Sequence, residues 1–200
     1  MTNVELEVGP APWFPVPRQW PTPDASDPQE WADLVASGTL GEGPDRDAAA
    51  ALLLALAHRR QDPDHPSDLT FVRAGATDVV PTTVDVVVLP AEGDAVERHR
   101  YLGRADVPGQ VGAVQVDEVF AAHLGTGTSV LRFDPVERGG RQVVTGSLRC
   151  FWRVDDVDVA VALSAPDVGE LLASVPALQE LVDTLVVVRD APGPTGGRTA

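Results

Sequence analysis

Gly139 and Gly140 stand between two strand-like runs, and together they limit this chain to folds that contain a tight antiparallel hairpin. Glycine reaches the positive φ values that a two-residue hairpin turn requires. The residues before the turn, 130–134, have the composition of a strand, and so do the residues after it, 142–154. The turn around 138–141 therefore predicts a hairpin and fixes the register of its two strands.

The second strand of this hairpin alternates regularly enough to assign each side chain to a face. One face is expected to carry Val144, Gly146, Leu148, Cys150, Trp152 and Val154. The other is expected to carry Thr145, Ser147, Arg149, Phe151 and Arg153. This pattern is typical of an antiparallel strand with one buried face and one face toward solvent. Cys150 is therefore expected inside, where burial makes a thiol unreactive.

The rest of the chain predicts further strands and helices in mixed order. Strands are expected at 4–8, 69–72, 84–89, 112–120, 157–163 and 186–188, with a proline-rich edge strand at 13–21. Helices are expected at 28–38, 45–60 and 174–185, with a helical turn after 167. The segment 123–128 is expected to turn, and 91–106 fits a strand or a helix. The sequence thus predicts an α+β fold, an antiparallel β-sheet flanked by helices.

The first helix has the clearest start signal. Asp27 can cap it, Pro28 suits the first helical position, and Glu30 completes a capping box. Its apolar stripe would include Trp31, Leu34 and Val35, and Gly38 would end it. Residues 1–189 are expected to form a single domain, and the Pro- and Gly-rich residues 190–200 a disordered tail.

The formal net charge is −15, from 30 acidic and 15 basic residues, and none of the basic residues is lysine. So acidic a chain repels nucleic acid and anionic membrane surfaces. Its acidity either gives solubility or provides a surface for a basic protein partner. The absence of lysine is typical of a GC-rich, for example actinobacterial, genome. No signal peptide or membrane-spanning run is recognisable, and a single cysteine excludes an intrachain disulfide. A cytoplasmic location is expected.

The order of elements resembles the PsbP-like group (PsbP/DcrB type). The aromatic and proline-rich segment 13–20 carries this resemblance near the start, and the segments 149–163 and 176–188 carry it near the end. The resemblance implies an antiparallel sheet between helices, in proteins that serve as binding or assembly factors. The chain departs from the group because it has no recognisable signal peptide or lipobox. The resemblance implies no catalytic residue.

The densest group of metal-ligating side chains is His58, Asp62, Asp64, His65 and Asp68. Three or four ligands converging on one point would make a zinc-type site. The alternative is a helix end followed by a polar turn, since Asp-Pro and His-Pro are ordinary turn sequences. Elsewhere the chain has no P-loop and no Gly-x-Ser-x-Gly elbow. The sequence predicts no cofactor.

A second candidate site is a basic and aromatic patch on the hairpin, formed by Arg132, Arg149, Phe151 and Arg153. Such a patch could bind an anionic ligand or a carboxylate-rich partner. Two alternatives remain open: the arginines could pair with nearby carboxylates such as Asp134, Glu137 or Asp158, or a helix could cover this face and shelter Phe151. The edge segment adds Trp13 and Trp20 as candidate contacts.

Two hypotheses for function follow. The first is a non-enzymatic protein-binding, assembly or chaperone-type factor, which the acidity and the absence of catalytic motifs favour. The second is a small metal-dependent enzyme that uses the His58–His65 segment. The sequence does not choose a client for the first or a substrate for the second.

Overall fold

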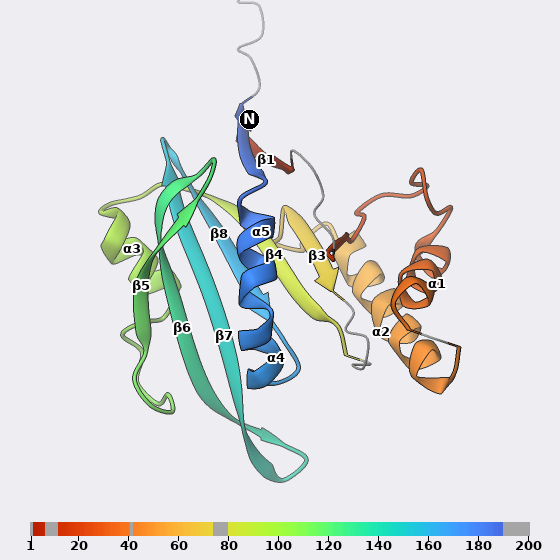
Figure 1. The fold of residues 1–200 in the computed structure, drawn as a ribbon. Helices are drawn as coiled ribbons and strands as arrows, with labels where there is room; N and C mark the ends of the chain where they lie inside the picture. Colours follow the sequence, from red (N-terminus) through yellow and green to blue (C-terminus); the bar gives the residue numbers. More distant parts are fainter. Residues whose placement is uncertain (1, 7–11, 41, 74–79, 190–200) are drawn as a thin grey trace, which may run out of the picture.

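The chain forms an α+β fold around one large antiparallel sheet, as predicted (Figure 1). The computed structural model describes residues 2–6, 12–40, 42–73 and 80–189. Seven strands pair in the order β2-β3-β4-β8-β7-β6-β5. These strands are β2 (Phe14–Pro15), β3 (Leu69–Arg73), β4 (Thr82–Pro90), β5 (Gln115–Ala121), β6 (Gly125–Arg138), β7 (Arg141–Val154) and β8 (Val157–Ser164). A separate ribbon pairs β1 (Thr2–Leu6) with β9 (Leu185–Arg189).

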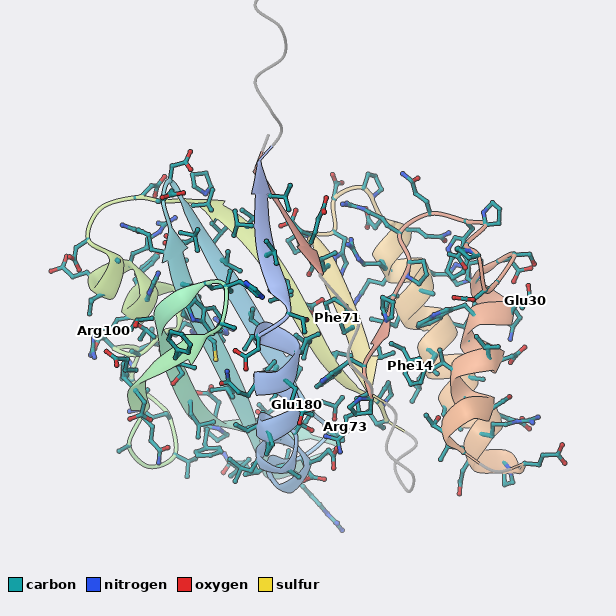
Figure 2. All side chains as sticks on the ribbon, turned by 45° about the horizontal axis from the view of Figure 1, so that its top comes forward. Phe14, Glu30, Phe71, Arg73, Arg100 and Glu180 are labelled. Atoms are coloured by element: carbon teal, nitrogen blue, oxygen red, sulfur yellow. The ribbon has the colours of Figure 1, made fainter. Side chains whose placement is uncertain are left out.

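Helices cover both faces of the large sheet. On one face, which we call the front, α4 (Val168–Ala173) and α5 (Val175–Val182) pack over the middle strands. On the other face, the back, α1 (Pro28–Thr39) and α2 (Pro44–Gln61) pack on β3 through Val72. Helix α3 (Ala95–Leu102) covers the back of β6 and β7. Figure 2 places Arg100 of α3 and Glu30 of α1 at opposite ends of the molecule.

The predicted hairpin is confirmed. Strands β6 and β7, each of 14 residues, pair from Gly127 with Trp152 to Arg138 with Arg141. Gly139 and Gly140 form the turn with φ values of 58° and 75°. The resulting register turns Cys150 and Trp152 into the front core, where they are 4% and 0% exposed.

Three predicted details are wrong. The segment 123–128 is not only a turn, because β6 begins at Gly125 and Gly127 is already paired with Trp152. Helix α1 runs through Gly38 and ends at Thr39, and Leu34 is 53% exposed instead of buried. Pairing with β7 extends β6 into the predicted turn, because contacts with a neighbouring strand, and not local composition alone, decide where a strand begins.

The ambiguous segment 91–106 contains a helix. Asp94 caps α3 by accepting a hydrogen bond from the Glu97 amide at 3.0 Å. The predicted tail 190–200 lies outside the described residues. None of the described helices has the length and apolar character needed to cross a membrane.

Candidate functional site

The three arginines of the predicted basic patch lie on the back of the hairpin, under α3 and the loop that follows it. Arg132 is 3% exposed, and its Nε donates to both carboxylate oxygens of Asp134 at 2.8 and 2.9 Å. Its Nη1 donates to the carbonyl oxygens of Arg104 and Val107. The Arg132 hydrogen bond holds the pKa of Asp134 below its usual value, although burial opposes this. This arginine therefore anchors the loop and presents no open surface.

Arg153 anchors the other end of α3. Its Nε and Nη2 donate to the two oxygens of Asp158 at 2.8 and 3.0 Å, and its Nη1 donates to the Gly93 carbonyl at 2.7 Å. Phe151 is 3% exposed and stacks on His99 of α3, with ring centroids 5.5 Å apart. The structure thus shows both alternatives raised by the sequence: Arg132 and Arg153 pair with the local carboxylates Asp134 and Asp158, and helix α3 shelters Phe151.

Arg149 differs from its two neighbours. It is half-buried, and its Nη1 donates to the Leu102 carbonyl at the end of α3. No described carboxylate forms an ion pair with it, whereas Arg132 and Arg153 each have one. Among the arginines of the predicted patch, Arg149 is therefore the one whose charge remains available to bind a ligand.

The two candidate tryptophans hold the N-terminal segment in place. Trp13 is 4% exposed, and its Nε1 donates to the Ala177 carbonyl of α5 at 2.9 Å. Trp20 is half-buried and packs against Trp31 of α1, with ring centroids 6.4 Å apart. The segment between them adds β2 to the edge of the sheet. These contacts support an anchoring role for both indoles.

The metal-site candidates do not converge in the structure. His58 is exposed at the end of α2, where its Nδ1 lies 3.4 Å from the Gln61 side-chain oxygen. Asp62 accepts a hydrogen bond from the Asp64 amide, and His65 accepts one from the Ser67 amide. Across the described ranges, no three His, Cys, Asp or Glu side chains are placed to hold one metal ion. The segment 58–68 is therefore a helix end followed by a polar turn, which was the alternative interpretation of its sequence.

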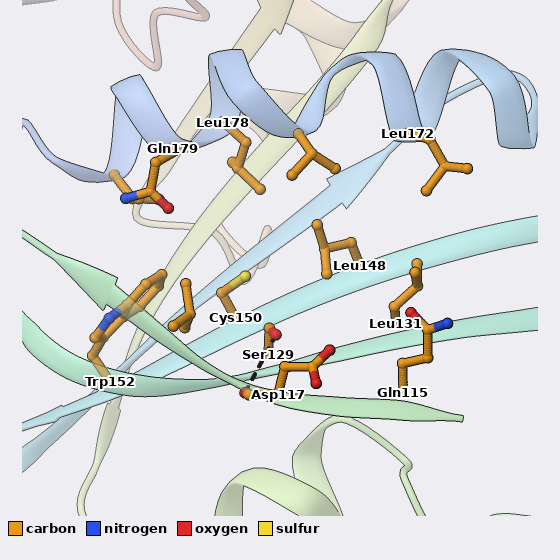
Figure 3. A pocket seen from close by; sticks show the side chains of 13 residues that line it. Gln115, Asp117, Ser129, Leu131, Leu148, Cys150, Trp152, Leu172, Leu178 and Gln179 are labelled. Atoms are coloured by element: carbon orange, nitrogen blue, oxygen red, sulfur yellow. Dashed lines mark hydrogen bonds between the residues drawn. The ribbon is translucent and has the colours of Figure 1, made fainter. Parts of the chain in front are cut away.

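The structure shows a cleft that the sequence did not reveal, on the front of the sheet between β5–β7 and the helices α4 and α5 (Figure 3). Its volume is about 280 Å³. Leu172 and Leu178 point from the helices toward Leu148 and Cys150 on the strands, and Trp152 lies at one end. The walls beneath the helices are therefore apolar.

The cleft becomes polar toward the edge of the sheet. Strand register places Asp117 of β5, Ser129 of β6 and Cys150 of β7 in one row across the front face. The Ser129 hydroxyl donates to the Asp117 carbonyl at 3.4 Å. Burial raises the pKa of Cys150 to about 12, so its thiol contributes apolar surface and no nucleophile. The cleft can bind apolar groups under the helices and polar groups at its rim.

Strand β5, which borders the cleft, is the last strand of the sheet and pairs with β6 alone among the described strands. The side chain of Gln179 on α5 donates to the Phe120 carbonyl at 2.8 Å and so ties α5 to the C-terminal end of β5. A second cavity, of about 310 Å³, lies on the other side of β5 and is lined by Val116, Glu118 and Val96 among others. The free edge of β5 is thus flanked by a cavity on each face.

Sequence reasoning missed the cleft because three segments distant in sequence form it. One signal was available: Ser129 is a polar residue on the same face of β6 as Leu131, and the hairpin register sets it opposite the buried Cys150 of β7. A polar residue on the core-facing side of a strand indicates that the helices do not cover that point.

No family model and no curated protein matches this chain. Among solved structures, it is similar to LpqN of Mycobacterium tuberculosis, a protein involved in cell envelope biogenesis. The TM-score is 0.47 with 10% sequence identity, over 94% of this chain and 85% of LpqN. At this identity the likeness is a distant one of fold.

Proposed function

We propose that this chain is a non-enzymatic protein-binding domain that takes an extended segment of a partner along β5, with apolar side chains of that segment in the front cleft. The observation that carries the proposal is the apolar cleft opening beside a free edge strand. Apolar surface removed from water contributes roughly 25 cal/mol per Å², so filling such a cleft stabilises a complex.

The two cavities beside β5 suit a strand more than a compact ligand. Successive side chains of an added strand point to opposite faces of the sheet. One set would enter the front cleft near Leu172 and Leu178, and the other would face the back cavity near Val116 and Glu118. Backbone hydrogen bonds to β5 would supply affinity, and the two cavities would supply selectivity.

Charge favours a basic segment. Asp117 and Glu118 are exposed on the edge strand, and the whole chain carries a formal charge of −15. Complementary charge speeds encounter and selects among partners with the same apolar pattern. A protein partner with alternating apolar and basic residues therefore fits this edge best. Membership in the PsbP-like group, whose members act as binding or assembly factors, is part of the same proposal and is supported by the order of elements.

A peptide of alternating Lys and Val tests the proposal against one of alternating Glu and Val. We expect the Lys peptide to bind at least about tenfold more tightly, because like charges across an interface are unfavourable. Titrations followed by ¹H–¹⁵N NMR report on the Trp152 indole N–H, the Gln179 side-chain amide and the β5 amides, all of which border the site.

Leu172→Lys places a charge at the mouth of the cleft, where Leu172 is 47% exposed. We expect it to weaken the Lys peptide by about tenfold, since a buried charge without a partner is costly. Leu34→Lys is the matched control, because Leu34 is a similarly exposed leucine on α1. Equal binding of both peptides, or no effect of Leu172→Lys, would refute the proposal.

A further inference from the structure

The back of the sheet has an uncovered groove between its two helical layers. Helices α1 and α2 pack on β3. Helix α3 packs on β6 and β7 and, through His99, on Asp158 near the start of β8, which leaves β4 and the middle of β8 between the two layers. Ala160 and Ala162 of β8 face this groove. Strand register sets Ala160 between Val87 of β4 and Phe151 of β7, and Ala162 between Asp85 of β4 and Arg149 of β7. The small alanine side chains leave an apolar cavity of about 190 Å³.

Arg149 lies at one end of this groove. Together with Leu102 it also lines a larger cavity of about 640 Å³ beneath α3, which contains Tyr101 and Arg104. One guanidinium therefore borders both an apolar groove and an open polar cavity. Such an arrangement matches a ligand with an apolar body and one charged end.

The positive charge at this junction is incompletely balanced. Arg104, Arg132 and Arg149 gather near Asp134, whose carboxylate is already bound by Arg132. No described carboxylate forms an ion pair with Arg104 or Arg149. Burial lowers the pKa of Arg149, and the like charges of Arg104 and Arg132 lower it further, while Asp134 partly offsets them. An anion here would relieve this repulsion.

The remaining hydrogen-bond donors of Arg149 are accessible. A guanidinium has five N–H donors, and Arg149 donates to the Leu102 carbonyl through Nη1. None of its nitrogens belongs to the buried, unpaired atoms of the described chain, in contrast to Arg60 and Arg98. Its other nitrogens are therefore not buried without a partner, and the side chain lines both cavities.

We propose that this groove binds a long-chain carboxylate, with the carboxylate on Arg149 and Arg104 and the chain over Ala160 and Ala162. A carboxylate and a guanidinium form strong, geometrically matched hydrogen bonds. Glu97 and Asp106 line the same cavity, with Asp106 paired to Arg100, and they disfavour polyanions such as polyphosphates. A single negative charge on an apolar chain satisfies both ends of the site. The site is separate from the front cleft and does not depend on the proposed function.

Decanoate is the test ligand, measured by isothermal titration calorimetry on the full chain against 1-decanol and acetate. We expect one decanoate site, and we expect decanol and acetate each to bind at least about tenfold more weakly. Decanol lacks the carboxylate, and acetate lacks the apolar chain. Arg149→Gln should weaken decanoate by about tenfold, the effect of losing one charge-assisted interaction. Arg141→Gln, at an exposed arginine that begins β7 beside the hairpin turn, is the matched control and should leave the decanoate affinity unchanged.

Ala160→Leu tests the groove without altering any charge. It fills the space above β8 and should weaken decanoate binding by about tenfold while acetate binding is unaffected. This variant keeps the test valid even where Arg149→Gln perturbs α3. Absence of decanoate binding, or binding unchanged by both Arg149→Gln and Ala160→Leu, overturns the proposal. Loss of decanoate binding in Leu172→Lys would also overturn the proposal, because it would show that the alkyl chain of decanoate lies in the front cleft. That result would leave the peptide-binding proposal for the front cleft intact.

Discussion

At the scale of single residues, Gly127 shows how a small side chain shapes the front cleft. A Cβ at this position would lie 2.3 Å from the Phe151 carbonyl oxygen and 2.6 Å from Cδ1 of Trp152. The indole of Trp152 therefore packs directly on the backbone of β6 and forms the end wall of the cleft. Composition alone indicated a turn at Gly127; the reason for the glycine is this close approach between neighbouring strands.

Gly127→Ala should destabilise the fold by about 1–3 kcal/mol, because the added methyl group meets backbone and a fully buried ring that cannot both move away. Urea unfolding measures the change. Gly38→Ala is the control: a Cβ at Gly38 meets nothing within 4 Å, so alanine in helix α1 should be neutral or stabilising by up to about 1 kcal/mol. Equal effects of the two substitutions would contradict this account of Gly127.

At the scale of elements, α3 depends on one buried carboxylate. Asp158 of β8 is 0% exposed and accepts hydrogen bonds from Arg153 and from His99 of α3, the latter at 3.2 Å. Arg153 in turn donates to the Glu92 and Gly93 carbonyls that precede the helix. The helix is short and buries few apolar side chains, so this polar cluster fixes its position.

The cluster makes stability depend on pH. Burial disfavours the charged form of Asp158, but the hydrogen bonds from Arg153 and His99 prevail and leave its pKa lowered. A lowered folded-state pKa means that the stabilisation is complete above the unfolded-state value of about 3.9 and is lost as pH falls through the folded-state value. We expect the free energy of unfolding of the wild type to fall in this acidic range.

Asp158→Asn should cost on the order of 3 kcal/mol near pH 6, because Arg153 loses its buried partner. The difference from wild type should shrink as the pH falls through the lowered folded-state pKa of Asp158, because the wild-type carboxyl then becomes neutral as well. Urea unfolding from pH 6 to pH 2 follows both chains, with Asp24→Asn as a control at an exposed loop carboxylate. A difference that stays constant across this range would show that Asp158 does not couple folding to protonation.

The elements that could be predicted from sequence are those whose own residues carry the signal, either as an alternation of buried and exposed positions or as a local cap. Strand β7 alternates because its front face is buried, and α1 starts at Asp27 because the cap bonds the Glu30 amide locally. Helix α3 could not be assigned because its stability comes from Asp158, which lies 59 residues away from His99 in the sequence. The same limit applies to the sites: Arg149 was identified, whereas the cleft and the groove exist only once distant segments are assembled.

At the scale of the whole molecule, the two sheets differ in how strongly they are held. In the seven-stranded sheet, β8 lies between β4 and β7 and is paired along both edges. Strands β1 and β9 pair only with each other among the described strands. A two-stranded ribbon is marginally stable by itself, although Leu185 at its base is fully buried in the front core. The single domain and the cytoplasmic location expected from the sequence stay predictions.

Hydrogen exchange measures this difference directly. Amides of β7 and β8 should exchange only through global unfolding, whereas those of β1 and β9 should exchange through a lower-energy local opening. We therefore expect urea to accelerate exchange in β8 steeply and in β9 only weakly, since local opening exposes little surface. Similar protection and similar urea dependence in both strands would mean that the terminal ribbon unfolds together with the large sheet. Because β9 follows directly on α5, which forms one wall of the front cleft, opening of the ribbon should also loosen that wall, and peptide bound at β5 should slow exchange in β9.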